Sequence, residues 1–86
     1  MARIQFTPQL RRFTDTPELE CAAATLAEAL AAAFVLNPRL RGYVLDDQGE
    51  LRPNVAVFVD GRRSQDIHQT LRADSQVFVL QALSGG

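Results

Sequence analysis

The sequence predicts an α+β roll, in which a mixed sheet of four or five strands carries one long helix on one face. Two stretches near the chain ends, 2–6 and 76–83, alternate apolar and polar residues as strands do. Between them, LAEALAAAFVL at 26–36 changes to the helical period and is rich in alanine. Because 86 residues bury only a modest core, we expect one domain over residues 1–86.

The first half of the chain is expected to hold two strands and the helix. ARIQF at 2–6 alternates, and ELECAAA at 18–24 alternates again, which predicts a hairpin partner. Thr25 and Glu28 form a capping box, in which the Thr hydroxyl accepts a first-turn N–H and the carboxylate reaches back. An Asn-Pro pair directly after the apolar run ends the helix. The stripe expected to face the sheet comprises Leu26, Leu30, Ala33 and Phe34.

The second half is expected to hold two turns and further strands. Residues 43–46 and 50–52 are predicted as extended segments that flank a turn at 47–49, which contains Asp and Gly. NVAVFV at 54–59 is a predicted strand, and the Asp-Gly pair that follows it is typical of a tight turn. The segment 64–74 is expected to be irregular, with at most one short helical turn.

Two known folds compete for this order of elements. A ferredoxin-like βαββαβ domain needs a second long helix, and residues 64–74 contain too few apolar residues to supply it. A β-grasp roll needs one long helix and ends on a strand that lies within the sheet. The sequence therefore favours the β-grasp roll.

Composition excludes several classes of protein. The formal net charge of −1 gives no basis for binding nucleic acid or an anionic membrane. The single cysteine, Cys21, cannot form an internal disulfide or a thiolate zinc site, which fits a reducing cytoplasm. The N-terminal stretch lacks the apolar region of a signal peptide, and the longest apolar run is too short to span a bilayer. We therefore expect a cytoplasmic protein.

Candidate catalytic residues do not assemble into a site. His68 is the only histidine, and it is expected to be a surface-loop residue because no triad or metal partners are evident. Cys21 is expected to pack as a small hydrophobe. Asp46, Asp47 and Glu50 are too few for a calcium loop and are expected to form a solvated turn. We therefore expect no enzyme, and no metal or cofactor bound by the chain itself.

The late strands predict an exposed apolar patch. If the valines of 54–59 and 76–83 point to the core, then Phe58, Phe78 and Leu80 point outward on neighbouring strands. Exposed apolar patches usually mark partner sites. The alternatives are a second core layer, or a sheet face that the irregular segment covers.

The chain ends on a diglycine directly after its last strand. Gly85 and Gly86 lack a Cβ, so a flexible tail at 84–86 is able to thread a narrow channel. Fully extended, this tail reaches about 10 Å past the sheet. Its carboxylate makes sense as a substrate that ATP converts to an acyl-adenylate, from which a sulfur nucleophile then displaces AMP.

The strand order and the ending VFVLQALSGG resemble the ubiquitin-like sulfur carriers of the ThiS/MoaD group, over essentially the whole chain. Residues 40–62 are similar to the middle segment of the longer carriers, which include the molybdopterin synthase small subunit and the cysteine-biosynthesis carrier. The shorter thiamine-type carriers lack much of this segment. The resemblance implies a ubiquitin-like β-grasp fold.

The resemblance also implies partners. An enzyme related to ubiquitin-activating enzymes would adenylate Gly86 with ATP and magnesium, while Gly85 gives access. A sulfur donor (a sulfurtransferase or desulfurase) would then form a thiocarboxylate, and a downstream enzyme would accept the sulfur. Phe58 falls where ubiquitin has its apolar hot-spot isoleucine. Leu80 falls where the molybdopterin carriers place an exposed partner-binding phenylalanine.

The approach to the diglycine departs from the family pattern. The family often has proline there, whereas this chain has Gln81-Ala82-Leu83-Ser84, of which Leu83 and Ser84 are expected to contact the partner. Before the last strand, the residues at 73–75 replace the usual Gly-Asp. The receiving pathway, whether molybdopterin, cysteine, thiamine or another, is therefore left open.

Two other functions fit the same sequence. A ubiquitin-like modifier would use the activated tail to acylate target lysines, and a plain β-grasp binding module would not need Gly86. All nine basic residues are arginine, which codon bias alone explains. A second interpretation is that a carrier without lysine cannot acylate its own side chains.

Overall fold

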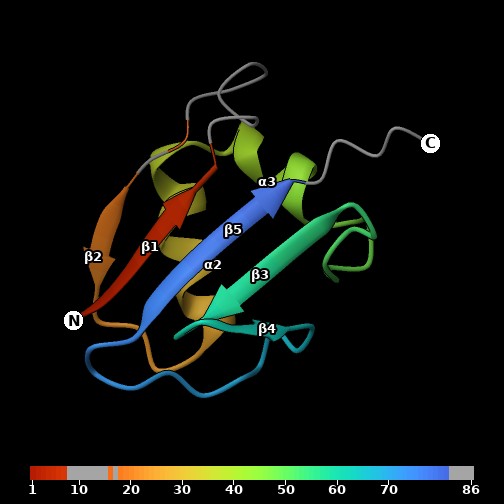
Figure 1. The fold of residues 1–86 in the computed structure, drawn as a ribbon. Coiled ribbons are helices and arrows are strands. Elements are labelled where there is room, and N and C mark those ends of the chain that lie inside the picture. Colours follow the sequence, from red (N-terminus) through yellow and green to blue (C-terminus); the bar gives the residue numbers. More distant parts are fainter. Residues whose placement is uncertain (8–15, 17, 82–86) are drawn as a thin grey trace.

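The computed structural model describes residues 1–7, 16 and 18–81. Over these residues it contains one five-stranded sheet, in the order β2-β1-β5-β3-β4, and two helices that cover one face of it (Figure 1). The central pair β1 and β5 is parallel and the other pairs are antiparallel, so the sheet is mixed, as expected. The elements are β1 (Ala2–Phe6), β2 (Leu19–Cys21), α2 (Leu26–Leu36), α3 (Arg39–Val44), β3 (Val55–Val59), β4 (Arg62–Ser64) and β5 (Gln76–Gln81).

The core lies between the sheet and the helices. Strand alternation sends Val57 of β3 and Val79 of β5 into this layer, where both are fully buried and directly opposite each other. From the other side, α2 contributes the apolar stripe predicted from its helical period. The buried residues of that stripe are Leu26, Ala29, Leu30 and Ala33, and Phe34 lies at its half-buried edge. Among the described residues, no helix has the length and apolar character needed to cross a membrane.

The start of α2 is capped twice. The Glu28 N–H donates to the Thr25 hydroxyl at 3.3 Å, and the Glu28 carboxylate accepts from the Ala24 N–H at 3.2 Å, which confirms the capping box. The first-turn N–H groups of Leu26 and Ala27 donate to backbone carbonyls of the segment 67–69. That irregular segment therefore crosses the helix start and satisfies N–H groups that a helix leaves open.

A second helix, α3, occupies part of the region predicted to be extended. The prediction of extended structure at 43–46 is wrong for Tyr43 and Val44, which end this six-residue helix, whereas Leu45 is extended as expected. Its sequence places Leu40 and Val44 four residues apart, and both are fully buried on one face. Extended pairing in this region is reduced to one bridge between Leu45 and Leu51. The helix α2 remains the one long helix of the fold.

Candidate functional site

The sheet face away from the helices carries rows of side chains that cross several strands. Phe78 on β5 is in register with Phe58 on β3 and with Gln5 on β1. Phe58 is in turn in register with Arg63 on the edge strand β4. Two aromatic rings therefore lie side by side at the middle of the face, with a polar residue at each end of the row.

Phe58, Phe78 and Leu80 form what we call the apolar patch. Phe78 is 40% exposed, whereas Phe58 and Leu80 are half-buried. Leu80 lies on the same face in the next row, in register with Ala56. Alternation places all three on the side opposite the buried valines, as the sequence predicts. Their role as partner contacts stays a prediction.

The face becomes polar toward the start of β5. Gln76 is in register with Arg3, and Arg3 forms an ion pair with Glu18. The Gln5 side-chain amide also donates to Glu18, at 3.1 Å. The apolar patch is therefore confined to the half of the face nearest the end of β5. An apolar centre with a polar rim is the usual composition of a protein interface.

The described part of β5 ends at Gln81. Gln81 is in register with Val55, and its backbone N–H donates to the buried Thr7 hydroxyl at 3.4 Å. Its side-chain oxygen Oε1 is buried and, in the part of the chain that the structure describes, has no hydrogen-bond partner. Beyond it, the predicted site residues Leu83, Ser84, Gly85 and Gly86 lie outside the described residues.

The start of β5 is held by a polar cluster around Asp60. The Asp60 carboxylate accepts the Gln76 N–H and the Ser75 hydroxyl, each at 2.9 Å, and lies 3.3 Å from the Arg72 guanidinium. The Gln76 N–H, then the Ser75 hydroxyl and the Arg72 charge, hold the pKa of Asp60 below its usual value. Ser75 itself is fully buried and accepts the Arg72 N–H at 2.8 Å.

From the sequence alone, the residues at 73–75 are notable only because they differ from the family's usual Gly-Asp. Their role depends on Asp60, which lies fifteen positions before Ser75 and is predicted only as a turn residue. Asp60 and Gly61 have positive φ angles of 52° and 84°, and they connect β3 to β4 as a tight turn. An Asp at such a turn, followed by a Ser-containing segment before the last strand, is the sequence signal for this cluster.

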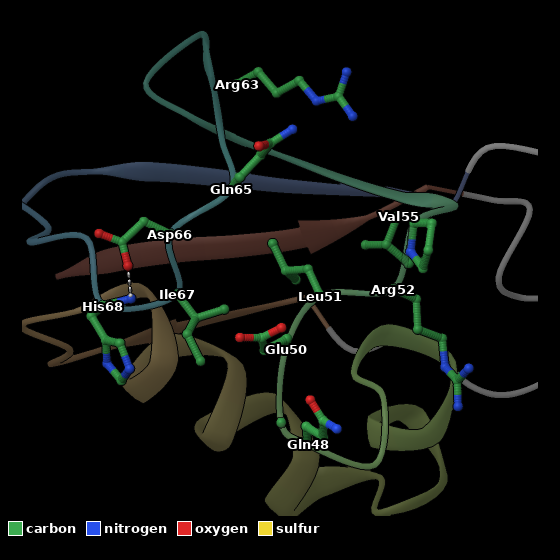
Figure 2. A pocket seen from close by; sticks show the side chains of 12 residues that line it. Gln48, Glu50, Leu51, Arg52, Val55, Arg63, Gln65, Asp66, Ile67 and His68 are labelled. Carbon is green, nitrogen blue, oxygen red and sulfur yellow. Dashed lines mark hydrogen bonds between the residues drawn. The ribbon is translucent and has the colours of Figure 1, made fainter.

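A groove of about 480 Å³ lies beside the edge strand β4, between the loop 48–53 and the segment 63–68 (Figure 2). It holds no catalytic arrangement among the described residues. The Asp66 carboxylate accepts the backbone N–H of His68 at 2.8 Å, and therefore braces the loop without orienting the imidazole. His68 is exposed, as expected for a surface-loop residue.

The other candidate residues have structural surroundings. Cys21 is half-buried against the core, and burial raises the pKa of its thiol. The Asp46 carboxylate accepts the N–H groups of Gln48 and Glu50 at 2.8 and 3.0 Å, which closes the predicted turn. These hydrogen bonds hold the pKa of Asp46 below its usual value. No group of metal-ligating side chains occurs within the described residues.

Comparison with known proteins rests on structure alone, because no family model and no curated protein matches the sequence. Small archaeal modifier protein 1 of Haloferax volcanii superposes with a TM-score of 0.79 at 23% identity, over 99% of this chain and 98% of that one. Its Methanosarcina acetivorans namesake gives 0.78 at 19% identity, over 99% and 95%. A chain of the BexX/CysO complex of Amycolatopsis orientalis gives 0.82 at 16% identity, with 100% of both chains covered.

These likenesses extend over the whole of each chain. They show that this chain has the same ubiquitin-like β-grasp fold as the archaeal modifier proteins and CysO. The fold expected from the strand order, from the single long helix and from the family resemblance is therefore confirmed. At 16–23% identity the likeness establishes the fold and leaves function to be argued from the surface.

Proposed function

We propose that this chain is a cytoplasmic carrier protein, a co-substrate of other enzymes and not an enzyme itself. An activating enzyme would join the Gly86 carboxylate to the AMP part of ATP, with magnesium on the nucleotide and pyrophosphate as the leaving group. A sulfide-level donor would then attack the acyl carbon and displace AMP. The product is a thiocarboxylate on Gly86, from which a downstream enzyme takes the sulfur.

The observation that carries this proposal is the position of the apolar patch. The patch occupies the half of the outer face where β5 ends, and the diglycine follows within five residues of Gln81. An enzyme that docks on Phe78 and Leu80 is therefore close to the start of the tail. Extended, five residues span about 17 Å, which is enough to enter an active site beside the docking surface.

The central position of β5 supports the same proposal. Its two edges pair with β1 and β3, so the strand that leads to the tail is held on both sides. The last pair within the described residues, Val55 with Gln81, fixes the position of the strand residue that precedes the C-terminal segment. A fixed origin reduces the conformational entropy lost when a partner aligns the carboxylate with ATP.

The likeness to the archaeal modifier proteins favours a second candidate function. A protein modifier would use the same activated Gly86 carboxylate, but the attacking group would be a lysine amine of a target protein. The two functions differ only in the nucleophile, so both need the apolar patch and the diglycine. A plain binding module would need the patch alone.

The partners of the carrier are proposed from this chemistry. They are an adenylating enzyme of the ubiquitin-activating type, a sulfur donor and a sulfur-accepting enzyme. Since Phe78 and Leu80 of the apolar patch lie on the strand that precedes the tail, we propose that the adenylating and accepting enzymes bind the patch in turn. Mutually exclusive binding lets the carrier leave one enzyme before it meets the next.

Intact-mass spectrometry tests the proposal. The protein is incubated with ATP, magnesium, sulfide and its cognate activating enzyme, and we expect one oxygen to be replaced by sulfur at the C-terminus. Deletion of Gly86 should abolish the change, whereas Asp74→Asn, at an exposed position with no proposed role in docking, should retain it. An unchanged mass with a competent enzyme would overturn the carrier proposal, and isopeptide adducts on other proteins without thiocarboxylate would favour the modifier.

A further inference from the structure

The outer face of α2 is unusually apolar for an exposed helix. Only one of its eleven residues, Glu28, is charged. Four of the others are buried against the sheet, yet Val35 and Leu36 at the helix end are 79% and 62% exposed. A surface helix ordinarily places charged residues on its solvent side, so this face has the composition of a covered surface.

A shallow apolar groove of about 330 Å³ lies on this face. It is lined by Ala31, Phe34, Val35, Pro38 and Arg41, from α2 and the start of α3. Figure 1 shows both helices behind the sheet, so the groove lies on the side of the molecule opposite the apolar patch. An enzyme docked on the patch would leave this groove open.

Charges at the two ends of this face have opposite signs. At the helical angle of 100° per residue, Glu28, Ala31 and Val35 follow one outward line, and Arg41, which follows the end of α2 in the chain, lines the groove beside Ala31 and Val35. Within the described part of the chain, the Arg41 guanidinium has no ion pair. The line therefore runs from an acidic end through small and apolar residues to a basic end.

Such a line is complementary to a reversed copy of itself. When two α2 helices pack antiparallel, Glu28 of each faces Arg41 of the other, and the opposed helix dipoles attract. In the middle, Val35 of one copy faces the small side chain at Ala31 of the other, so a large residue meets a small one. A parallel arrangement would instead bring like charges together at both ends.

We propose that this face, defined by Glu28, Ala31, Phe34, Val35 and Arg41, binds a second copy of the chain in an antiparallel, two-fold symmetric dimer. The dimer would carry two apolar patches and two tails on its outer sides, each free to dock. Two facing helices of this length bury less than the roughly 1,200 Å² of a standard interface, so we expect a weak dimer.

Sedimentation equilibrium tests the surface without ATP or any enzyme, so its result is independent of the proposed sulfur chemistry. We expect self-association that grows with concentration up to the millimolar range. Val35→Glu should weaken it at least tenfold, because the carboxylate would be buried without a partner. Phe78→Ser, on the opposite face, should leave it unchanged. A protein that stays monomeric at millimolar concentration, or a dimer that only Phe78→Ser disrupts, overturns the proposal.

A charge exchange between two variants tests the antiparallel geometry. Glu28→Arg alone and Arg41→Glu alone place like charges at both contacts, so each should be monomeric. An equimolar mixture should associate, because the arginine introduced in one variant then faces the glutamate introduced in the other, and the native Glu28 and Arg41 meet at the second contact. Since Glu28 also caps α2, circular dichroism checks that the first variant remains helical. A wild-type dimer combined with no association in the mixture would exclude this geometry.

Discussion

The two ends of strand β5 differ in how their polar groups are satisfied. At the start, the Asp60 carboxylate joins Ser75, Arg72 and the Gln76 N–H in one hydrogen-bonded cluster. At the end, the side-chain oxygen of Gln81 is buried without a partner among the described residues. The polar groups around Asp60 are therefore paired within the fold, whereas at the strand end that precedes the diglycine one buried side-chain oxygen has no partner among the described residues.

This difference separates stability from proposed function along a single strand. Substitutions at the start of β5 should unfold the protein more easily without changing how its tail is used. Substitutions near the end should change partner binding and tail chemistry without lowering the free energy of unfolding. A residue at one end of the strand can therefore be compared with a matched residue at the other.

The largest expected effect concerns lysines introduced at the two ends. The backbone carbonyl of Arg52 accepts the N–H of Val55, and Val55 is in register with Gln81 at the end of β5. Arg72 instead forms an ion pair with Asp60, at the start of β5. If fully extended, the five residues 82–86 would span about 17 Å, roughly the length of β5 itself. During activation, Arg52→Lys should therefore form an intramolecular amide between Gly86 and the new amine, detected as loss of water by intact mass.

Arg72→Lys is the control, and it should form far less of this amide, because its amine lies a full strand length from Gln81, at the limit of the reach of residues 82–86. The wild-type chain contains no lysine and should form none. Equal adducts in both variants would mean that acylation occurs between molecules. The absence of adducts in both would contradict the idea that a lysine near the tail endangers the carrier.

The next effect is on binding of the activating enzyme. Phe78→Ser removes the most exposed ring of the apolar patch, and we expect the KM for the carrier to rise about 10- to 100-fold, the range typical of an aromatic interface residue. Gln76→Ser, two residues earlier on the same face, should change KM less than about threefold. Steady-state pyrophosphate release measures both variants. Equal effects of the two substitutions would place the docking surface elsewhere.

Much of this comparison was predictable from sequence, because it depends on local periodicity. Alternation with a period of two puts Phe58, Phe78 and Leu80 on one face whatever the strand order, and the fold then makes β3 and β5 neighbours. The capping box at Thr25 was predictable for the same reason, since its partners lie three residues apart. Local patterns determine both features.

The parts that could not be predicted depend on contacts between distant segments. The Asp60 cluster joins residues fifteen and sixteen positions apart, and the amides at the start of α2 meet carbonyls some forty positions later. No local period encodes such pairs. The short helix α3 was missed for a different reason: its two buried residues, Leu40 and Val44, make only one helical repeat, which is too short to distinguish from extended structure.

A smaller effect is expected on stability at the start of β5. Asp60→Asn keeps a residue that tolerates the positive φ of 52° but removes the charge that Ser75, Arg72 and the Gln76 N–H surround. We expect the free energy of unfolding in urea at pH 7 to fall by about 1–3 kcal/mol. Asp74→Asn, at an exposed position nearby, should change it by less than about 0.5 kcal/mol.

The pH dependence of that loss follows from the lowered pKa of Asp60. A carboxylate whose pKa is lower in the folded state stabilises the fold above its unfolded-state pKa, about 3.9, and loses this contribution as the pH falls through the folded-state value. The wild type and Asp60→Asn should therefore differ in stability at neutral pH and converge in acid. A difference that persists at the lowest pH would mean that shape, not charge, holds the start of β5.

The smallest effect is expected at Gln81, where the sign should reverse. Gln81→Leu removes a buried oxygen that has no partner among the described residues, so the free energy of unfolding should rise by up to about 1 kcal/mol. Gln76→Leu, at an exposed position on the same strand, should give no gain. If Gln81→Leu is more stable but is activated more slowly, the oxygen accepts a hydrogen bond from the docked enzyme. If it is activated normally, the unsatisfied group serves neither stability nor docking, and the contrast between the two ends of β5 reduces to the cluster around Asp60.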